Sequence, residues 1–80
     1  MNADLDAAIR DVIAGSLRMP LDQMVPGASI TDDLGADSLL HMTVIMDLER
    51  RFAITIPDAE AARCTTVHDV VAVVRRRITR

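Results

Sequence analysis

Ser38 is the residue in this sequence whose surroundings most clearly point to chemistry. It follows Asp37 directly and lies three residues after Gly35, in the run DLGADSL at residues 33–39. A serine hydroxyl becomes a nucleophile when a base lies within hydrogen-bond reach and a third group orients that base. His41 is a candidate base, but no oxyanion motif or glycine-rich elbow flanks Ser38 on both sides. The sequence therefore gives a hydrolytic site little support.

The same residues are also typical of the start of a helix. Oxygens of Asp37 and Ser38 can accept hydrogen bonds from the unpaired amides of a first turn, and Gly35 can supply a positive φ before it. A helix amino terminus also suits a phosphate, because its free amides and its dipole favour negative charge. From the residues alone, Asp37 and Ser38 can be only capping residues, but a serine at this position can also carry a phosphodiester.

Metal binding and disulfide formation are not predicted. Cys64 and His68 have the i, i+4 spacing of two ligands on a helix, but two ligands do not make a closed metal site. Cys64 is the single cysteine, which excludes an internal disulfide, and we expect it to be a small buried residue. The first residues have no basic region followed by an apolar run, and no stretch approaches membrane-spanning length, so we expect a cytoplasmic protein without a membrane span.

Composition favours a small helical domain that binds other proteins. The chain has 80 residues, 50% of them hydrophobic but only 1% aromatic, and a formal charge of −3. This size leaves little room for a deep private active site, and the shortage of aromatic residues disfavours nucleic-acid binding. Residues 32–60 are acidic, which favours partners with basic surfaces. The arginines near the end, which we expect to complement a helix dipole or to contact an acidic partner, are Arg75, Arg76, Arg77 and Arg80.

Apolar spacing predicts an all-α fold in one domain, residues 1–80. We expect helices at about 4–17, 38 to 51 or 52, and from 67 onwards, with a short helical turn at 58–63. Asn2 or Asp4 can cap the first helix, and Thr66 with Asp69 resembles a capping box for the last. The prediction is a small antiparallel bundle of three main helices plus one short helix, with a long ordered loop between the first two, and a monomer. Loop residues expected to pack on the core are Leu21, Met24, Val25, Ile30 and Leu34, and the last helix should bury Val67, Val70, Val71, Val74 and Ile78.

The second helix carries two apolar stripes, whereas an ordinary surface helix needs one. One stripe, suited to the core, consists of Leu40, Val44, Ile45, Leu48 and Phe52. The other consists of Leu39, Met42 and Met46. Either the helix is central and buries both stripes, or the second stripe meets a partner, for which flexible methionine side chains are well suited.

Three blocks of the sequence resemble acyl carrier proteins. The run DLGADSL at residues 33–39 resembles their phosphopantetheine attachment motif, LERRFAITIPD at 48–58 resembles the end of their second helix, and TTVHDVV at 65–71 resembles the start of their last helix. Length, helix order and the long first loop agree, so the likeness covers essentially the whole chain.

The resemblance implies a carrier and not an enzyme. A phosphopantetheinyl transferase with magnesium would join the Ser38 hydroxyl to 4′-phosphopantetheine from coenzyme A, and the arm's thiol would hold an acyl group as a thioester. Asp37 belongs to the motif and would help to dock the transferase, with Gly35 at the turn and Leu39 beside the serine. Acyl-using synthases, ligases or acyltransferases of fatty-acid, lipid or polyketide-type synthesis would be the other partners. Residues on the side implied to face them are Leu39, Leu40, Met42, Thr43, Met46, Glu49 and Arg50.

The sequence departs from the common pattern of the family in its second helix. Leu40 and Thr43 stand where acidic residues usually lie, and Arg50 and Arg51 replace further acids. Because charge complementarity governs partner choice, we expect a specialised carrier with dedicated partners. The alternatives are a peptidyl or aminoacyl carrier, which would share the arm and the fold, and a helical interaction module in which Ser38 is only a cap.

Overall fold

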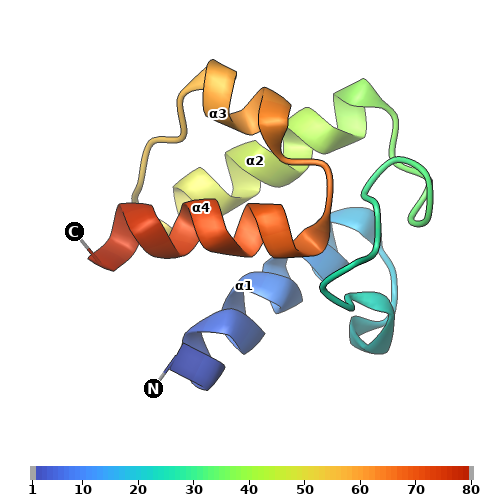
Figure 1. Ribbon diagram of the computed structural model, residues 1–80, viewed down its shortest axis with the longest axis horizontal. Coiled ribbons are helices and arrows are strands. Elements are labelled where there is room, and N and C mark those ends of the chain that lie inside the picture. Colours follow the sequence, from blue (N-terminus) through green and yellow to red (C-terminus); the bar gives the residue numbers. More distant parts are fainter. Residues whose placement is uncertain (1, 80) are drawn as a thin grey trace.

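The computed structural model describes residues 2–79. Four α-helices and one short 3-10 turn follow one another: α1 at Asn2–Leu17, η1 at Leu21–Gln23, α2 at Ser38–Phe52, α3 at Asp58–Arg63 and α4 at Val67–Thr79. Figure 1 shows α2 and α4 running in the same direction, opposite to α1, with the short α3 above α2 and α4. The predicted all-α bundle with a long first loop is confirmed.

The core lies between α1, α2 and α4. Ile9 and Ile13 from α1, Leu48 from α2 and Val74 from α4 are fully buried within it. Their helical spacing gives each helix one apolar face, and burial of such side chains contributes roughly 1.5–3 kcal/mol each. None of the helices in the described part of the chain is long and apolar enough to cross a membrane.

The long loop is ordered and packs on the core, as predicted, through Met24, Ile30 and the partly buried Leu34. Met24 and Ile30 are fully buried, whereas Leu21 and Val25 are 45% and 52% exposed, so the prediction for these two was wrong. None of the residues of η1 is buried, and adjacent residues of an irregular loop point in different directions, so Met24 faces the core and Val25 does not. Ser29 and Thr66 form an isolated bridge, which joins the loop to the segment before α4.

Two further expectations for the helices need correction. The first helix spans Asn2–Leu17, so Asp4 lies inside it and is not its cap, whereas the predicted cap at Asn2 concerns a side chain outside the described ones. In α4, the four predicted valines are buried, but Ile78 is 37% exposed because it lies near the end of the helix, beyond the core. The neighbouring arginines make ion pairs: Arg75 contacts Asp6 of α1, and Arg76 and Arg77 contact Glu60 of α3. Arg80 lies outside the described residues.

The capping box at the start of α4 is confirmed. The Asp69 amide donates to Thr66 Oγ1 at 3.1 Å, and Asp69 Oδ2 accepts from the amides of Thr65 and Thr66. Asp69 Oδ2 also accepts from the Thr65 hydroxyl at 3.0 Å. These hydrogen bonds, led by the one from the Thr65 amide, lower the pKa of Asp69 from its ordinary value.

The lowered pKa of Asp69 predicts a pH-dependent contribution to stability. A carboxylate with a lower pKa in the folded chain stabilises it above its unfolded pKa of about 4, and this stabilisation is lost as the pH falls towards the folded pKa. We expect Asp69→Ala to lower the free energy of unfolding by about 1 kcal/mol near pH 7. Urea titrations of both proteins at pH 7 and pH 3 should show this difference shrinking in acid. A difference that does not change with pH would contradict the role of the charged carboxylate.

Candidate functional site

Asp37 caps α2, and Ser38 occupies the first position within the helix. Asp37 has an extended backbone, and its Oδ1 accepts a hydrogen bond from the Leu40 amide at 2.8 Å. Ser38 is exposed, and within residues 2–79 its hydroxyl has no hydrogen bond. The prediction that Ser38 might serve as the cap was therefore wrong, because Asp37, one residue earlier, satisfies the amide that a cap must reach. The Ser38 hydroxyl is left available for other chemistry.

Gly35 makes the turn that presents Ser38. Its φ of +74° lies in the left-handed region, which a glycine adopts at low cost. The following Ala36 is 4% exposed, and its amide donates to the Ile30 carbonyl at 3.0 Å. The chain is thus anchored to the core two residues before Ser38, which fixes the start of α2.

Among the described residues, His41 makes no hydrogen bond with the Ser38 hydroxyl. Its Nε2 lies 2.8 Å from the Cys64 carbonyl oxygen. A carbonyl can only accept, so Nε2 carries the proton and donates it, and His41 ties α2 to the segment after α3. Cys64 itself is 3% exposed, and burial raises the pKa of its thiol, as expected for an inert core cysteine. No three His, Cys, Asp or Glu side chains among the described residues gather in a way that could hold a metal ion.

An apolar cleft of about 560 Å³ lies beside Ser38, between α2 and α3. Ser38 and His41 line it near the start of α2, and Glu49 and Asp58 add carboxylates to its wall. The Glu49 carboxylate also accepts from the Ile56 amide at 2.8 Å, which anchors the chain on its way to α3. Apolar residues lining this α2–α3 cleft are Met42, Ile45, Met46, Ile56, Ala61 and Ala62.

The second apolar stripe of α2 is exposed. Leu39, Met42 and Met46 are 73%, 58% and 49% exposed, so the interpretation that α2 buries both stripes was wrong. The first stripe faces inward as expected: Val44, Ile45 and Leu48 are buried, whereas Leu40 and Phe52 are partly buried against the core.

The predicted partner-facing residues divide among three surfaces of α2. Met42, Met46 and Glu49 line the α2–α3 cleft. Leu39, Leu40 and Thr43 line a separate hollow of about 320 Å³ with Gly35 and Asp37. Arg50 belongs to neither of them.

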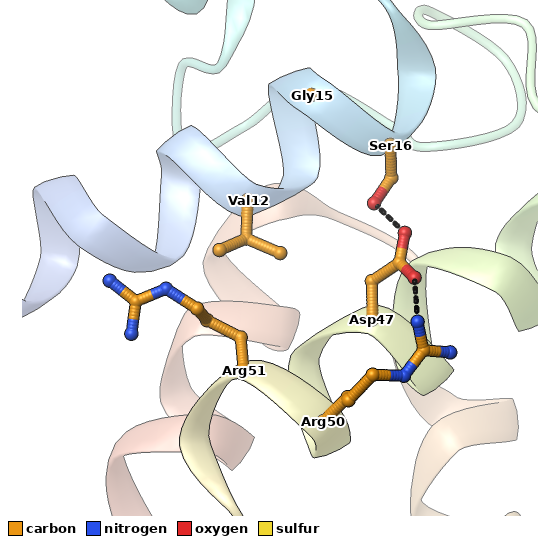
Figure 2. A pocket seen from close by; sticks show the side chains of 6 residues that line it. All are labelled: Val12, Gly15, Ser16, Asp47, Arg50 and Arg51. Carbon is orange, nitrogen blue, oxygen red and sulfur yellow. Dashed lines mark hydrogen bonds and ion pairs between the residues drawn. The ribbon is translucent and has the colours of Figure 1, made fainter.

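Arg50 lies at a shallow groove between α1 and α2. Figure 2 shows Ser16 of α1 reaching Asp47 of α2, with a Ser16 Oγ to Asp47 Oδ2 distance of 2.5 Å. Arg50 Nη1 lies 3.8 Å from the other oxygen of Asp47, and Arg51 extends away from this carboxylate. The groove therefore has a hydrogen bond that joins the two helices and two arginines at its edge. Spacing along one helix could not identify the Ser16 contact, because the two residues are far apart in the sequence.

Comparison with known proteins assigns the family. The family described as "Phosphopantetheine attachment site" matches residues 7–74 of this chain. The chain belongs to the acyl carrier protein family. The acyl carrier protein of Desulforapulum autotrophicum is 36% identical over 74 residues, covering 91% of this chain and 96% of the relative. Those of Exiguobacterium sp. and Thermosynechococcus vestitus are 40% and 37% identical over 70 residues, covering 88% of this chain and 89% and 86% of the relatives.

Membership of the acyl carrier protein family gives this chain a covalently attached 4′-phosphopantetheine and a role as a carrier in acyl biosynthesis rather than as an enzyme. The structure offers residues that fit this group. Ser38 presents an exposed hydroxyl at the amino end of a 15-residue helix, where backbone amides and the helix dipole favour a phosphate. The α2–α3 cleft opens beside it and offers an apolar surface of the kind that an acyl chain requires.

Proposed function

We propose that Ser38 is the attachment point of 4′-phosphopantetheine and that the α2–α3 cleft shelters the acyl chain carried on the arm. The observation that supports this most directly is the exposed Ser38 hydroxyl, which has no hydrogen bond among the described residues and lines an apolar cleft. When bound, the group supplies a terminal thiol that holds an acyl chain as a thioester. The residues of this chain position that group and shield its cargo.

The residues around Ser38 stabilise the charge of the phosphate and fix the position of the serine. The amino end of α2 stabilises the phosphate by about 0.3–1 kcal/mol for an exposed site, and Gly35 and Ala36 fix its position. The Asp37 carboxylate would repel a phosphate if it stood alone, but it is bonded through Oδ1 to the Leu40 amide and is exposed to an incoming cation. We propose that Asp37 helps to dock the transferase and its magnesium.

The proposed partners are a phosphopantetheinyl transferase and acyl-using synthases, ligases or acyltransferases. We propose that the carrier is a monomer and that it binds these enzymes in the cytoplasm. The apolar side chains of Met42, Ile45 and Met46 in the α2–α3 cleft offer the kind of surface that an acyl chain requires. Incubation with coenzyme A and a broad-specificity transferase, followed by intact-mass measurement, tests the assignment. A carrier gains the phosphopantetheine mass, whereas an interaction module keeps its original mass.

We also propose that this carrier serves dedicated partners. Leu40 and Thr43 remove acidic charge near the start of α2, and Arg50 and Arg51 add positive charge near its end. The side chain of Arg50 is 73% exposed and its ion pair with Asp47 is long, so its charge is accessible to an acidic group on a partner. Such charges affect mainly the rate of encounter and the choice of partner.

Competition with a standard carrier tests this specialisation. In elongation by purified fatty-acid synthase enzymes, we expect this chain to be used about tenfold less efficiently at low salt, because its charges are less complementary to basic enzyme surfaces. The variant Arg50→Glu/Arg51→Glu should recover part of the difference. Equal turnover of the two carriers would contradict the specialised assignment.

A further inference from the structure

The α3 helix is weakly anchored by apolar contacts. It has six residues, none of which is buried, and of its apolar side chains Ala61 packs partly against the core. Its principal helix neighbour is α4, and Figure 1 shows it above α2 and α4 at the edge of the bundle. Since Ala61 and Ala62 line the α2–α3 cleft, the position of α3 determines how open this cleft is.

Polar contacts hold the segments on both sides of α3. Before it, the Ile56 amide donates to Glu49 of α2 at 2.8 Å. After it, the Cys64 carbonyl lies 2.8 Å from Nε2 of His41, also on α2. These contacts hold the segments at the two ends of α3, so the position of the helix between them depends on its contact with α4.

That contact is an ion-pair cluster centred on Glu60. Its Oε2 is bonded to Nη2 of Arg77, and its Oε1 lies 3.8 Å from Nη2 of Arg76. The side chains of Glu60 and Arg77 are only 29% and 30% exposed, so their attraction is less screened than that of a fully exposed pair. Both arginines come from the last turn of α4.

We propose that Glu60, Arg76 and Arg77 form an ionic latch that holds α3 over the α2–α3 cleft, so that releasing the latch lets α3 move and the cleft open. The movement of α3 does not depend on the proposed function, whereas its consequence for an acyl chain rests on it. Partner charges that compete for Glu60 or for the arginines would then promote opening.

Amide hydrogen exchange of the full-length protein, with and without the phosphopantetheine arm, tests the latch. Useful reporters are the amides of Ala61 and Cys64, which are bonded to Pro57 and Ala61, and the Leu48 amide in α2 serves as an internal reference. We expect Glu60→Gln and Arg77→Gln each to raise exchange at α3 about threefold to tenfold, with little change at Leu48. Arg50→Gln removes the same positive charge as Arg77→Gln, but from an exposed site on α2, and should leave exchange at α3 unchanged.

Salt provides a second measurement on the same samples. Raising the ionic strength to about 1 M shortens the screening length to about 3 Å and should raise α3 exchange in the wild-type protein but not in Glu60→Gln. Unchanged α3 exchange in Glu60→Gln and Arg77→Gln, or an equal rise at Leu48, would overturn the latch. Because these measurements do not require an acyl cargo, such a result would leave the assignment of Ser38 intact.

Discussion

Ser38→Ala should abolish attachment of phosphopantetheine while leaving the fold intact. The substitution removes the hydroxyl that the proposed reaction requires, so we expect no mass gain after incubation with coenzyme A and a broad-specificity transferase. The Ser38 side chain is exposed and has no hydrogen bond within residues 2–79, so the free energy of unfolding should change by no more than about 0.5 kcal/mol. Intact-mass and urea measurements on the same preparation separate loss of the site from loss of the fold.

Ser29→Ala is the matched control for this prediction. Ser29 lies in the ordered loop, where its hydroxyl accepts from the Asp32 amide at 3.1 Å. The variant should still gain the full mass. A mass gain that persists in Ser38→Ala would show that another residue carries the group, and the assignment of Ser38 would be wrong.

Substitutions of Asp37 should separate its part in folding from its part in recognition. Asparagine also caps helices, so Asp37→Asn should keep most of the bond to the Leu40 amide, whereas Asp37→Ala should lower the free energy of unfolding by about 1 kcal/mol. Both variants lose the charge proposed to meet the transferase and its magnesium. We expect the rate of modification to fall by about tenfold to a hundredfold in each, the range for loss of a hydrogen bond to a charged group.

Asp32→Asn controls for the change in net charge. Asp32 is an exposed acid in the loop before α2, and its side chain makes no hydrogen bond or ion pair within the described part of the chain. Its removal should leave the rate of modification within about twofold of wild type, because Asp32 does not line the hollows beside Ser38 and an exposed charge is screened by salt. Modification of Asp37→Asn at the wild-type rate would show that Asp37 acts only as a helix cap.

Local patterns in the sequence predicted the helices and the position of Ser38 at the start of α2. The spacing of Val44, Ile45 and Leu48 gave the inward face of α2, and the Thr66 and Asp69 pair correctly predicted the start of α4. These predictions succeed because periodicity and capping depend on residues a few positions apart.

Features that depend on long-range contacts could not be predicted in this way. The spacing of two apolar stripes did not reveal that Met42 and Met46 are exposed along a cleft, because this depends on where α3 packs. Likewise, the ion pairs of Glu60 with Arg76 and Arg77 join residues that only the folded chain brings together. Asp37 rather than Ser38 is the cap because α2 begins at Ser38, one residue earlier than a cap at Ser38 would require.

Fragmentation of the modified wild-type protein tests the central claim most directly. The chain contains no lysine, so cleavage after arginine gives a peptide of residues 19–50, which holds both Ser29 and Ser38. We expect fragment ions to place the phosphopantetheine mass on Ser38. A mass located on Ser29, or on any residue outside this peptide, would contradict the assignment of Ser38.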